Sequence, residues 1–171
     1  MTAWQSVLEE ARESGWWLVL LGFGDDGKFE SQLRGCPVNR CRAYGPAFGN
    51  QKAAVLQHSS AFILPSYSEG LPMAALEAMA NGLPCLLSEA CNIPAAFHVK
   101  AAERAEPDAS QLIGALKSLF SMTVAQREEM GSNGRRLTSQ NFNWSEIAQR
   151  MLEVYLWMQG EGPLPLSIKS L

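Results

Sequence analysis

The segment from Ala61 to Leu87 constrains the fold more than any other part of the chain. It contains an apolar run (61–64), a turn rich in Ser and Gly, a helical stretch opened by Pro72, and a second apolar run (85–87). Short, wholly apolar runs that alternate with helices are typical of parallel strands buried on both faces. The segment therefore predicts an α/β fold in which a crossover helix joins two parallel strands.

The same alternation extends over most of the chain. We expect strands over 16–21, 41–44, 61–64 and 85–87, the first of them buried on both faces. We expect helices over 2–14, 28–34, 50–58, 71–81 and 108–120. The pattern predicts one Rossmann-like parallel sheet with flanking helices.

Two further helices are marked by their first residues. Capping boxes are expected at Thr123 to Gln126 and at Asn143 to Glu146, where each side chain would serve the other residue's backbone N–H. The last helix carries apolar residues on one face: Ile147, Met151, Val154, Tyr155 and Met158. We expect one domain over residues 1–159, followed by a loose tail rich in Gly and Pro over residues 160–171.

Composition excludes several classes of protein. A chain of 171 residues is long enough for one domain with a core, and a net charge of −3 gives no reason to expect a nucleic-acid partner. No apolar run approaches the roughly 20 residues of a membrane span, and no signal peptide is indicated, so a cytoplasmic chain is expected. The four cysteines lack metal-ligand spacing and are expected to be reduced, with no metal bound.

The turn before the helix at 71–81 has the features of an anion site. In open parallel sheets, ligands bind outside the carboxyl ends of the strands. A helix N-terminus there offers free backbone N–H groups and partial positive charge, which together hold phosphate. Gly70 lets the backbone approach a ligand closely. Because Pro72 has no N–H, the donors would be the amides of Leu71, Met73 and Ala74.

Two glutamates flank this anion site. Glu69 lies in the turn and is unsuited to a phosphate, but its carboxylate can accept hydrogen bonds from hydroxyl groups. Glu77 lies about two turns into the helix, roughly 9–12 Å away, and could meet a second pair of hydroxyls. A diphosphate between two polyols is a nucleotide sugar. In the simpler alternative, Glu77 is solvated and Glu69 only favours the helix dipole.

A second glycine motif suggests a different ligand. Gly22, Gly24 and Gly27 match the G-x-G-x-x-G pattern of dinucleotide-binding proteins, which would indicate a nicotinamide-dependent dehydrogenase. Asp25 and Asp26 would face the pyrophosphate with like charge, and no acidic residue lies about 20 positions further on. We therefore expect the glycines to form a strand-to-helix turn beside the donor site.

Residues 65–84 closely resemble the donor-sugar signature of the retaining GT-B glycosyltransferases of family 4, the group 1 type. The shared pattern is P-S-x-x-E-G-x-x-x-x-x-x-E-A-x-A-x-G-x-P, which contains the paired glutamates of the family's EX7E motif. Residues 17–24 resemble the second strand of the family's donor domain, 44–46 its turn near the nucleobase, and 143–155 its closing helix. The resemblance covers roughly residues 2–158 and implies the C-terminal half of a GT-B fold.

The resemblance implies a role for each matching residue. Glu69 would contact the donor sugar as the catalytic residue, and Glu77 would bind the ribose. The donor-binding residues would be Gly22, Gly24, Tyr44, Gly45, Ser68, Gly70, Leu71, Pro72, Met73, Ala74 and Glu77. The family transfers a sugar from a nucleotide donor with retention, as in polysaccharide biosynthesis, and needs no metal or other cofactor.

The chain also departs from the family pattern. Its first residues already resemble the family's first helix, so the strand before it, with an Arg and a Lys that stabilise the leaving diphosphate, is expected to be absent. The family's acceptor-binding N-terminal half is expected to be absent too, and Asn92 to Ala95 replaces a Gly-x-Pro-Glu segment. Leaving-group stabilisation is commonly worth several kcal/mol, so activity of the chain alone is doubtful.

Two functions remain open at this point. The chain is either the donor-binding half of a glycosyltransferase, or a truncated relative that binds nucleotide sugars or partners without turnover. A missing central strand would leave two sheet edges unpaired, and such edges recruit partners. We therefore expect pairing with a separate N-terminal half, through which the chain could lie at a membrane surface, or self-association.

Overall fold

The computed structural model describes residues 2–22 and 40–169. The helices are α1 (Thr2–Ser6), α2 (Leu8–Glu13), α4 (Gly49–His58), α5 (Met73–Ala80), α6 (Pro94–His98), α7 (Ala109–Ser121), α8 (Val124–Asn141), α9 (Trp144–Met158) and α10 (Leu166–Lys169), with a 3-10 turn η2 (Glu89–Cys91). The strands are β1 (Leu18–Leu21), β2 (Cys41–Tyr44), β3 (Phe62–Leu64), β4 (Cys85–Leu87) and β5 (Ala102–Arg104). The expected helix over 28–34 lies outside the described residues.

All described strands pair in parallel, as the α/β pattern predicts, but they form two sheets instead of one. The first sheet contains β1 and β2, and the second has the order β3-β4-β5. No described strand pairs with both β1 and β3, which is why the expected single sheet is divided. Each of these two strands consequently has one unpaired edge among the described residues.

The core lies on both faces of the second sheet. Side chains of adjacent residues in a strand point to opposite faces, so Leu87 joins a cluster with Met79 of α5 and Leu137 of α8, whereas Leu86 joins a cluster with Leu116 of α7. The second cluster also receives Trp4, Val7 and Ala11 from α1, α2 and the residue between them. Leu18 and Leu20 of β1 pack against this same cluster, so both sheets share one core.

The expectation that the strand beginning near Trp16 is buried on both faces is wrong. Leu18 and Leu20 are partly buried, but Val19 is 47% exposed and Leu21 is 41% exposed. The continuous apolar run has the composition of a central strand, yet no described element covers the face that carries Val19 and Leu21. The wholly buried strand is β4, in which all three side chains are inaccessible to solvent.

Helix α5 ends in a tight turn that brings it against α8. Gly82 adopts a positive φ of 76°, its amide donates to the Met79 carbonyl, and the Leu83 amide donates to the Ala78 carbonyl. These two bonds form a Schellman motif, which explains why glycine follows the helix. A Cβ atom on Gly131 of α8 would collide with the carbonyl oxygen of Gly82, so the two helices meet through backbone atoms.

Most helix starts follow the sequence pattern. Asp108 caps α7, where its carboxylate accepts a bond from the Ser110 hydroxyl and from two backbone amides. The Ser110 hydroxyl contributes most to holding the pKa of Asp108 below its usual value. Thr123 and Gln126 form the complete capping box predicted for α8.

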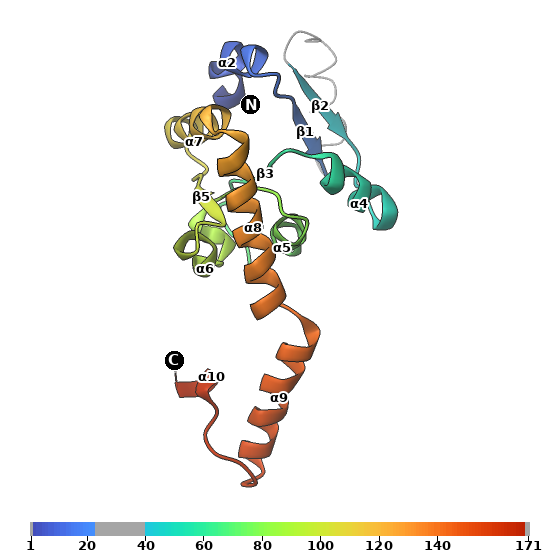
Figure 1. The fold of residues 1–171 in the computed structure, drawn as a ribbon, viewed down its shortest axis with the longest axis vertical. Helices are drawn as coiled ribbons and strands as arrows, with labels where there is room; N and C mark the ends of the chain where they lie inside the picture. The colour runs from blue at the N-terminus through green and yellow to red at the C-terminus, as the bar shows by residue number, and fades with distance from the viewer. Residues whose placement is uncertain (1, 23–39, 170–171) are drawn as a thin grey trace.

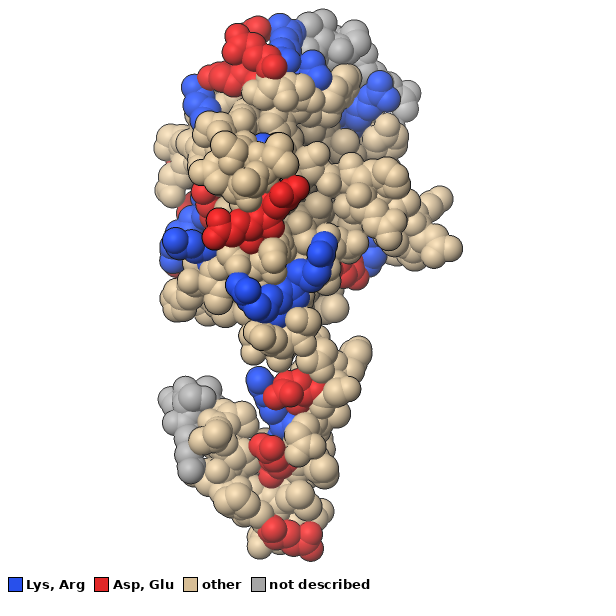
Figure 2. All heavy atoms as spheres, in the orientation of Figure 1, with Lys and Arg blue, Asp and Glu red and all other residues tan. Residues whose placement is uncertain are grey.

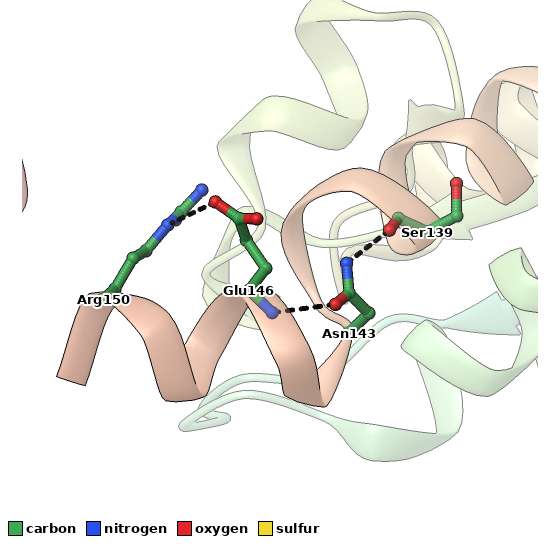
Figure 3. Close-up of polar contacts among 4 residues, drawn as sticks. All are labelled: Ser139, Asn143, Glu146 and Arg150. Carbon is green, nitrogen blue, oxygen red and sulfur yellow. Dashed lines mark hydrogen bonds and ion pairs between the residues drawn. The ribbon is translucent and has the colours of Figure 1, made fainter. Parts of the chain in front are cut away.

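The capping box expected at α9 is only half formed. The Asn143 side chain accepts a bond of 2.9 Å from the Glu146 amide, and its Nδ2 atom donates to the Ser139 carbonyl at 2.6 Å (Figure 3). The Glu146 carboxylate instead faces Arg150, whose Nε atom lies 3.4 Å away. Arg150 carries the opposite charge one turn further along α9, and it competes with the Asn143 backbone amide for the Glu146 carboxylate.

Helix α9 projects away from the sheets and from α1 to α7 (Figure 1). It has the predicted amphipathic pattern, but none of its residues is buried. Its exposed apolar side chains are Trp144, Ile147, Met151, Leu152, Tyr155, Trp157 and Met158. Figure 2 shows the projecting part largely in uncharged residues, with a few charges of both signs. The segment from residue 160 contains α10, and the domain boundary at residue 159 stays a prediction.

The described cysteines, Cys41, Cys85 and Cys91, are free and buried. Burial raises the pKa of the Cys85 thiol to about 12. Within 2–22 and 40–169, no helix combines the length and the apolar character that crossing a membrane requires.

Candidate functional site

The loop between β3 and α5 carries most of the predicted site residues. Glu69 is partly buried, and one of its carboxylate oxygens accepts a bond of 2.7 Å from the Ser66 hydroxyl. Ser68 is exposed in the same loop. Ser66 is in turn fixed through its carbonyl, which accepts a 2.7 Å bond from the buried Ser88 hydroxyl. The carboxylate is thereby held by its own loop, and that loop is held from the segment after β4.

Asn92 fixes the backbone of the same loop. Its Nδ2 atom donates to the carbonyls of Glu69 at 2.6 Å and of Gly70 at 3.1 Å, while the Glu69 amide donates to the Ala90 carbonyl. Asn92 has a φ of 54°, a left-handed conformation that asparagine tolerates better than most residues. The residue that stands outside the family signature therefore holds the signature loop in place.

Gly70 leaves an open space beside the loop. An added Cβ atom would meet nothing within 4 Å, and its φ lies outside the left-handed range that demands glycine. Neither packing nor backbone conformation thus requires a glycine here. The open space would let a ligand approach the backbone closely.

The first turn of α5 presents unpaired amides, as predicted. Pro72 is the N-cap and provides no side-chain cap; its carbonyl accepts from Ala75 and Leu76. The amides of Met73 and Ala74 have no acceptor among the described residues. Met73 and Leu71 are exposed, so solvent reaches this end of the helix. Orphan N–H groups at an exposed helix N-terminus are the kind of backbone donor that can hold an anion.

Glu77 lies one turn further along α5 and forms an ion pair with Lys52 of α4. The Nζ atom of Lys52 is 2.7 Å from the Oε1 atom of Glu77. The Oε2 atom is shielded from solvent and has no hydrogen-bond partner among the described residues. The sequence left the surroundings of Lys52 undecided, because 25 positions separate the two residues and no local pattern connects them.

The remaining predicted residues lie at the ends of β1 and β2. Tyr44 is the last residue of β2 and is about half exposed, and Gly45 follows it with open space around its Cα atom. Gly22 directly follows β1. Gly24 lies outside the described residues, as does the rest of the dinucleotide-type motif.

Comparisons with known proteins identify the family and the fold of the chain. The family model described as "Glycosyl transferases group 1" matches residues 2–137. The MMP alpha-(1->4)-mannosyltransferase of Mycolicibacterium hassiacum is 31% identical over 106 residues, which is 60% of this chain and 26% of that protein.

Two solved structures share the fold. The crystal structure of WaaG, a glycosyltransferase involved in lipopolysaccharide biosynthesis, matches with a TM-score of 0.70 and 19% identity over 86% of this chain and 40% of that one. Sucrose-phosphate synthase from Thermosynechococcus elongatus matches with a TM-score of 0.70 and 21% identity over 93% of this chain and 43% of that one.

The chain thus spans about a quarter of the mannosyltransferase and about two fifths of each solved structure. Its parallel strands and flanking helices match the C-terminal domains of these GT-B proteins. With the family model matched over most of its length, the chain belongs to the group 1 glycosyltransferases and has the fold of their C-terminal GT-B domain.

Proposed function

We propose that this chain is the donor-binding half of a retaining, family 4 glycosyltransferase and binds a nucleotide diphosphate sugar. The observation that carries the proposal is the placement of two carboxylates on either side of two orphan amides. The amides of Leu71, Met73 and Ala74 would hold the diphosphate. Glu69 would contact the donor sugar, and Glu77 would bind the ribose. Tyr44 and Gly45 would line the nucleobase side, and Gly22 and Ser68 would also belong to the donor site.

The chemistry of each group suits its proposed partner. Backbone N–H groups at a helix N-terminus favour phosphate through both hydrogen bonds and the helix dipole. Carboxylates accept hydrogen bonds from hydroxyls, which is how they grip a sugar. No metal or cofactor is required for this binding. Sugar transfer would follow only when an acceptor-binding half supplies the second substrate.

We expect Glu77→Ala to weaken binding of the preferred nucleotide by roughly 10- to 100-fold, the worth of a charge-assisted hydrogen bond. Calorimetric titration of the chain with UDP, GDP and their sugars measures this. Glu129→Ala, which removes an exposed glutamate from α8, is the control for net charge. Equal affinities of Glu77→Ala and the unmodified chain would remove the ribose assignment.

We also propose that one edge each of β1 and β3, unpaired within the part of the chain that the structure describes, receives a strand from a partner, namely the acceptor-binding half. The Leu18 amide donates a hydrogen bond to the Arg40 carbonyl, so the backbone groups of Val19 and Leu21 face away from β2. The Phe62 amide likewise donates a hydrogen bond to the Pro84 carbonyl, so the backbone groups of Ile63 face away from β4. Because unpaired strand edges recruit partner strands, each of these two edges can accept a further strand. The exposed apolar side chains of α9 offer a second contact for the same partner.

Without that partner we expect the chain to self-associate, because its free edges and the apolar face of α9 remain exposed. Size-exclusion chromatography with light scattering, over a range of concentrations, tests this. In Val19→Pro, which removes one outward-facing amide and leaves the bond from Leu18 in place, association should weaken. A stable monomer with a cooperative melting transition would argue against the proposal.

A further inference from the structure

The ion pair between Lys52 and Glu77 joins the two halves of the domain. Lys52 belongs to α4, which follows the first sheet, and Glu77 belongs to α5, which follows the first strand of the second sheet. No other hydrogen bond or ion pair connects α4 to α5 among the described residues. Both side chains are partly exposed, at 42% and 31%, and such pairs contribute little to stability because both charges stay partly solvated.

Among residues 2–22 and 40–169, the second oxygen of Glu77 is an acceptor without a donor. A carboxylate accepts at both oxygens, and a buried acceptor left unpaired is unusual enough to need an explanation. The last torsion of a glutamate is broad and two-fold, so either oxygen can be the one that Lys52 holds. This oxygen is shielded in the structure, so a ligand hydroxyl reaches it only after the partly exposed Glu77 side chain rotates, with the ion pair to Lys52 retained.

Lys52 also resolves an electrostatic conflict in the proposed site. Glu77 is four residues after Met73, about 6 Å along the axis of α5. An uncompensated carboxylate at that distance would repel a diphosphate bound to the first-turn amides. The ammonium group of Lys52, 2.7 Å from Oε1, offsets this charge and lets one helix present both an anion site and a carboxylate.

We propose that Lys52 is a positioning residue for ribose recognition: it fixes and neutralises one oxygen of Glu77 so that the other accepts a bond from a ribose hydroxyl beside the diphosphate. This inference rests on the proposed function and adds a residue that lies outside the signature segment. It predicts that Lys52 acts on the ribose through Glu77 and has no direct contact of its own with it.

The test compares ribonucleotides with their 2′-deoxy counterparts. The full chain and the variants Lys52→Met, Lys52→Arg, Glu77→Gln and the double variant Lys52→Met with Glu77→Gln are titrated with UDP, GDP, ADP and the corresponding deoxynucleotides. We expect the unmodified chain to prefer its best ribonucleotide by about tenfold, the worth of one such hydrogen bond. Lys52→Met should reduce this preference to about twofold or less, and Lys52→Arg should retain most of it.

The double variant separates a positioning role from an independent one. If Lys52 acts through Glu77, Lys52→Met should not change the preference further once Glu77 is Gln. Lys117→Met is the matched control, because Lys117 of α7 forms a comparable, partly exposed ion pair with Glu10 of α2. This variant should prefer ribonucleotides over deoxynucleotides as strongly as the unmodified chain does.

Four results would contradict the positioning role of Lys52, and one of them would also contradict the proposed function. An unchanged ribose preference in Lys52→Met, or a further change in the Glu77→Gln background, overturns the positioning role and leaves the proposed function intact. Binding of ribo- and deoxynucleotides with equal affinity by the unmodified chain overturns it as well. If the unmodified chain binds none of the three nucleotides, the proposed function fails and this inference fails with it.

Discussion

Gly131→Ala is expected to lower the free energy of unfolding by about 3 kcal/mol, the upper part of the range for overpacked sites. The added methyl group would meet the carbonyl oxygen of Gly82, which belongs to the backbone of the turn that ends α5. A backbone group in a Schellman turn cannot move aside as a flexible side chain can. Either α8 shifts away from α5 or the turn opens, and both responses disturb the cluster that contains Met79 and Leu137.

The sign of this effect distinguishes packing from helix propensity. In an open helical position alanine is more favourable than glycine by about 1 kcal/mol. Gly114 of α7 provides that control, since an added Cβ atom there would meet nothing within 4 Å. Chemical denaturation followed by circular dichroism should show Gly114→Ala as neutral or stabilising and Gly131→Ala as strongly destabilising. If Gly131→Ala is also stabilising, α5 and α8 do not meet through backbone atoms.

Met73→Pro is expected to weaken nucleotide diphosphate binding by about 10- to 100-fold, which corresponds to one charge-assisted hydrogen bond. Proline is well tolerated at the first position of a helix, so the substitution removes a single orphan N–H while α5 remains intact. The preceding residue, Pro72, already has the extended conformation (ψ 107°) that a following proline requires. The loss tests the amide of Met73 itself, because the backbone donor is deleted without a change of charge.

Met73→Ala is the control for this experiment, because it shortens the exposed side chain and keeps the amide. Calorimetry with inorganic pyrophosphate and with the preferred nucleotide should show reduced affinity for both ligands in Met73→Pro alone. Thermal unfolding followed by circular dichroism verifies that α5 is retained. Equal binding by the two variants would show that this amide does not hold the diphosphate, and the anion would have to lie elsewhere.

The sequence alone predicted the local parts of this protein well. The strands at 41–44 and 85–87 were predicted with their observed bounds. The second is a short apolar run after Gly82 and Pro84, and the first is ended by Gly45 and Pro46. The orphan amides of α5 follow directly from Pro72 and from the absence of a capping side chain, since both depend only on neighbours in the chain. Strand β5 and helix α6 were missed, because they are too short for a periodic signal.

Contacts between distant segments could not be predicted in this way. Three contacts join residues that are at least 22 positions apart in the chain. They are the ion pair of Lys52 with Glu77, the hydrogen bonds from Asn92 to the loop of Glu69, and the close approach of Gly131 to the Gly82 carbonyl. The exposure of Val19 was also mispredicted, since an apolar run records which side chains favour burial but not whether another element covers them.

The chain's own pattern thus determined the longer helices, most of the strands, the parallel α/β class and the glutamate pair beside a helix start. Periodicity, capping residues and turn residues act over a few positions, so they can be read without knowing the fold. The tertiary structure decided how the strands divide into two sheets and which cation faces Glu77. Those features depend on how separate elements pack together, and no local sequence signal fixes that packing.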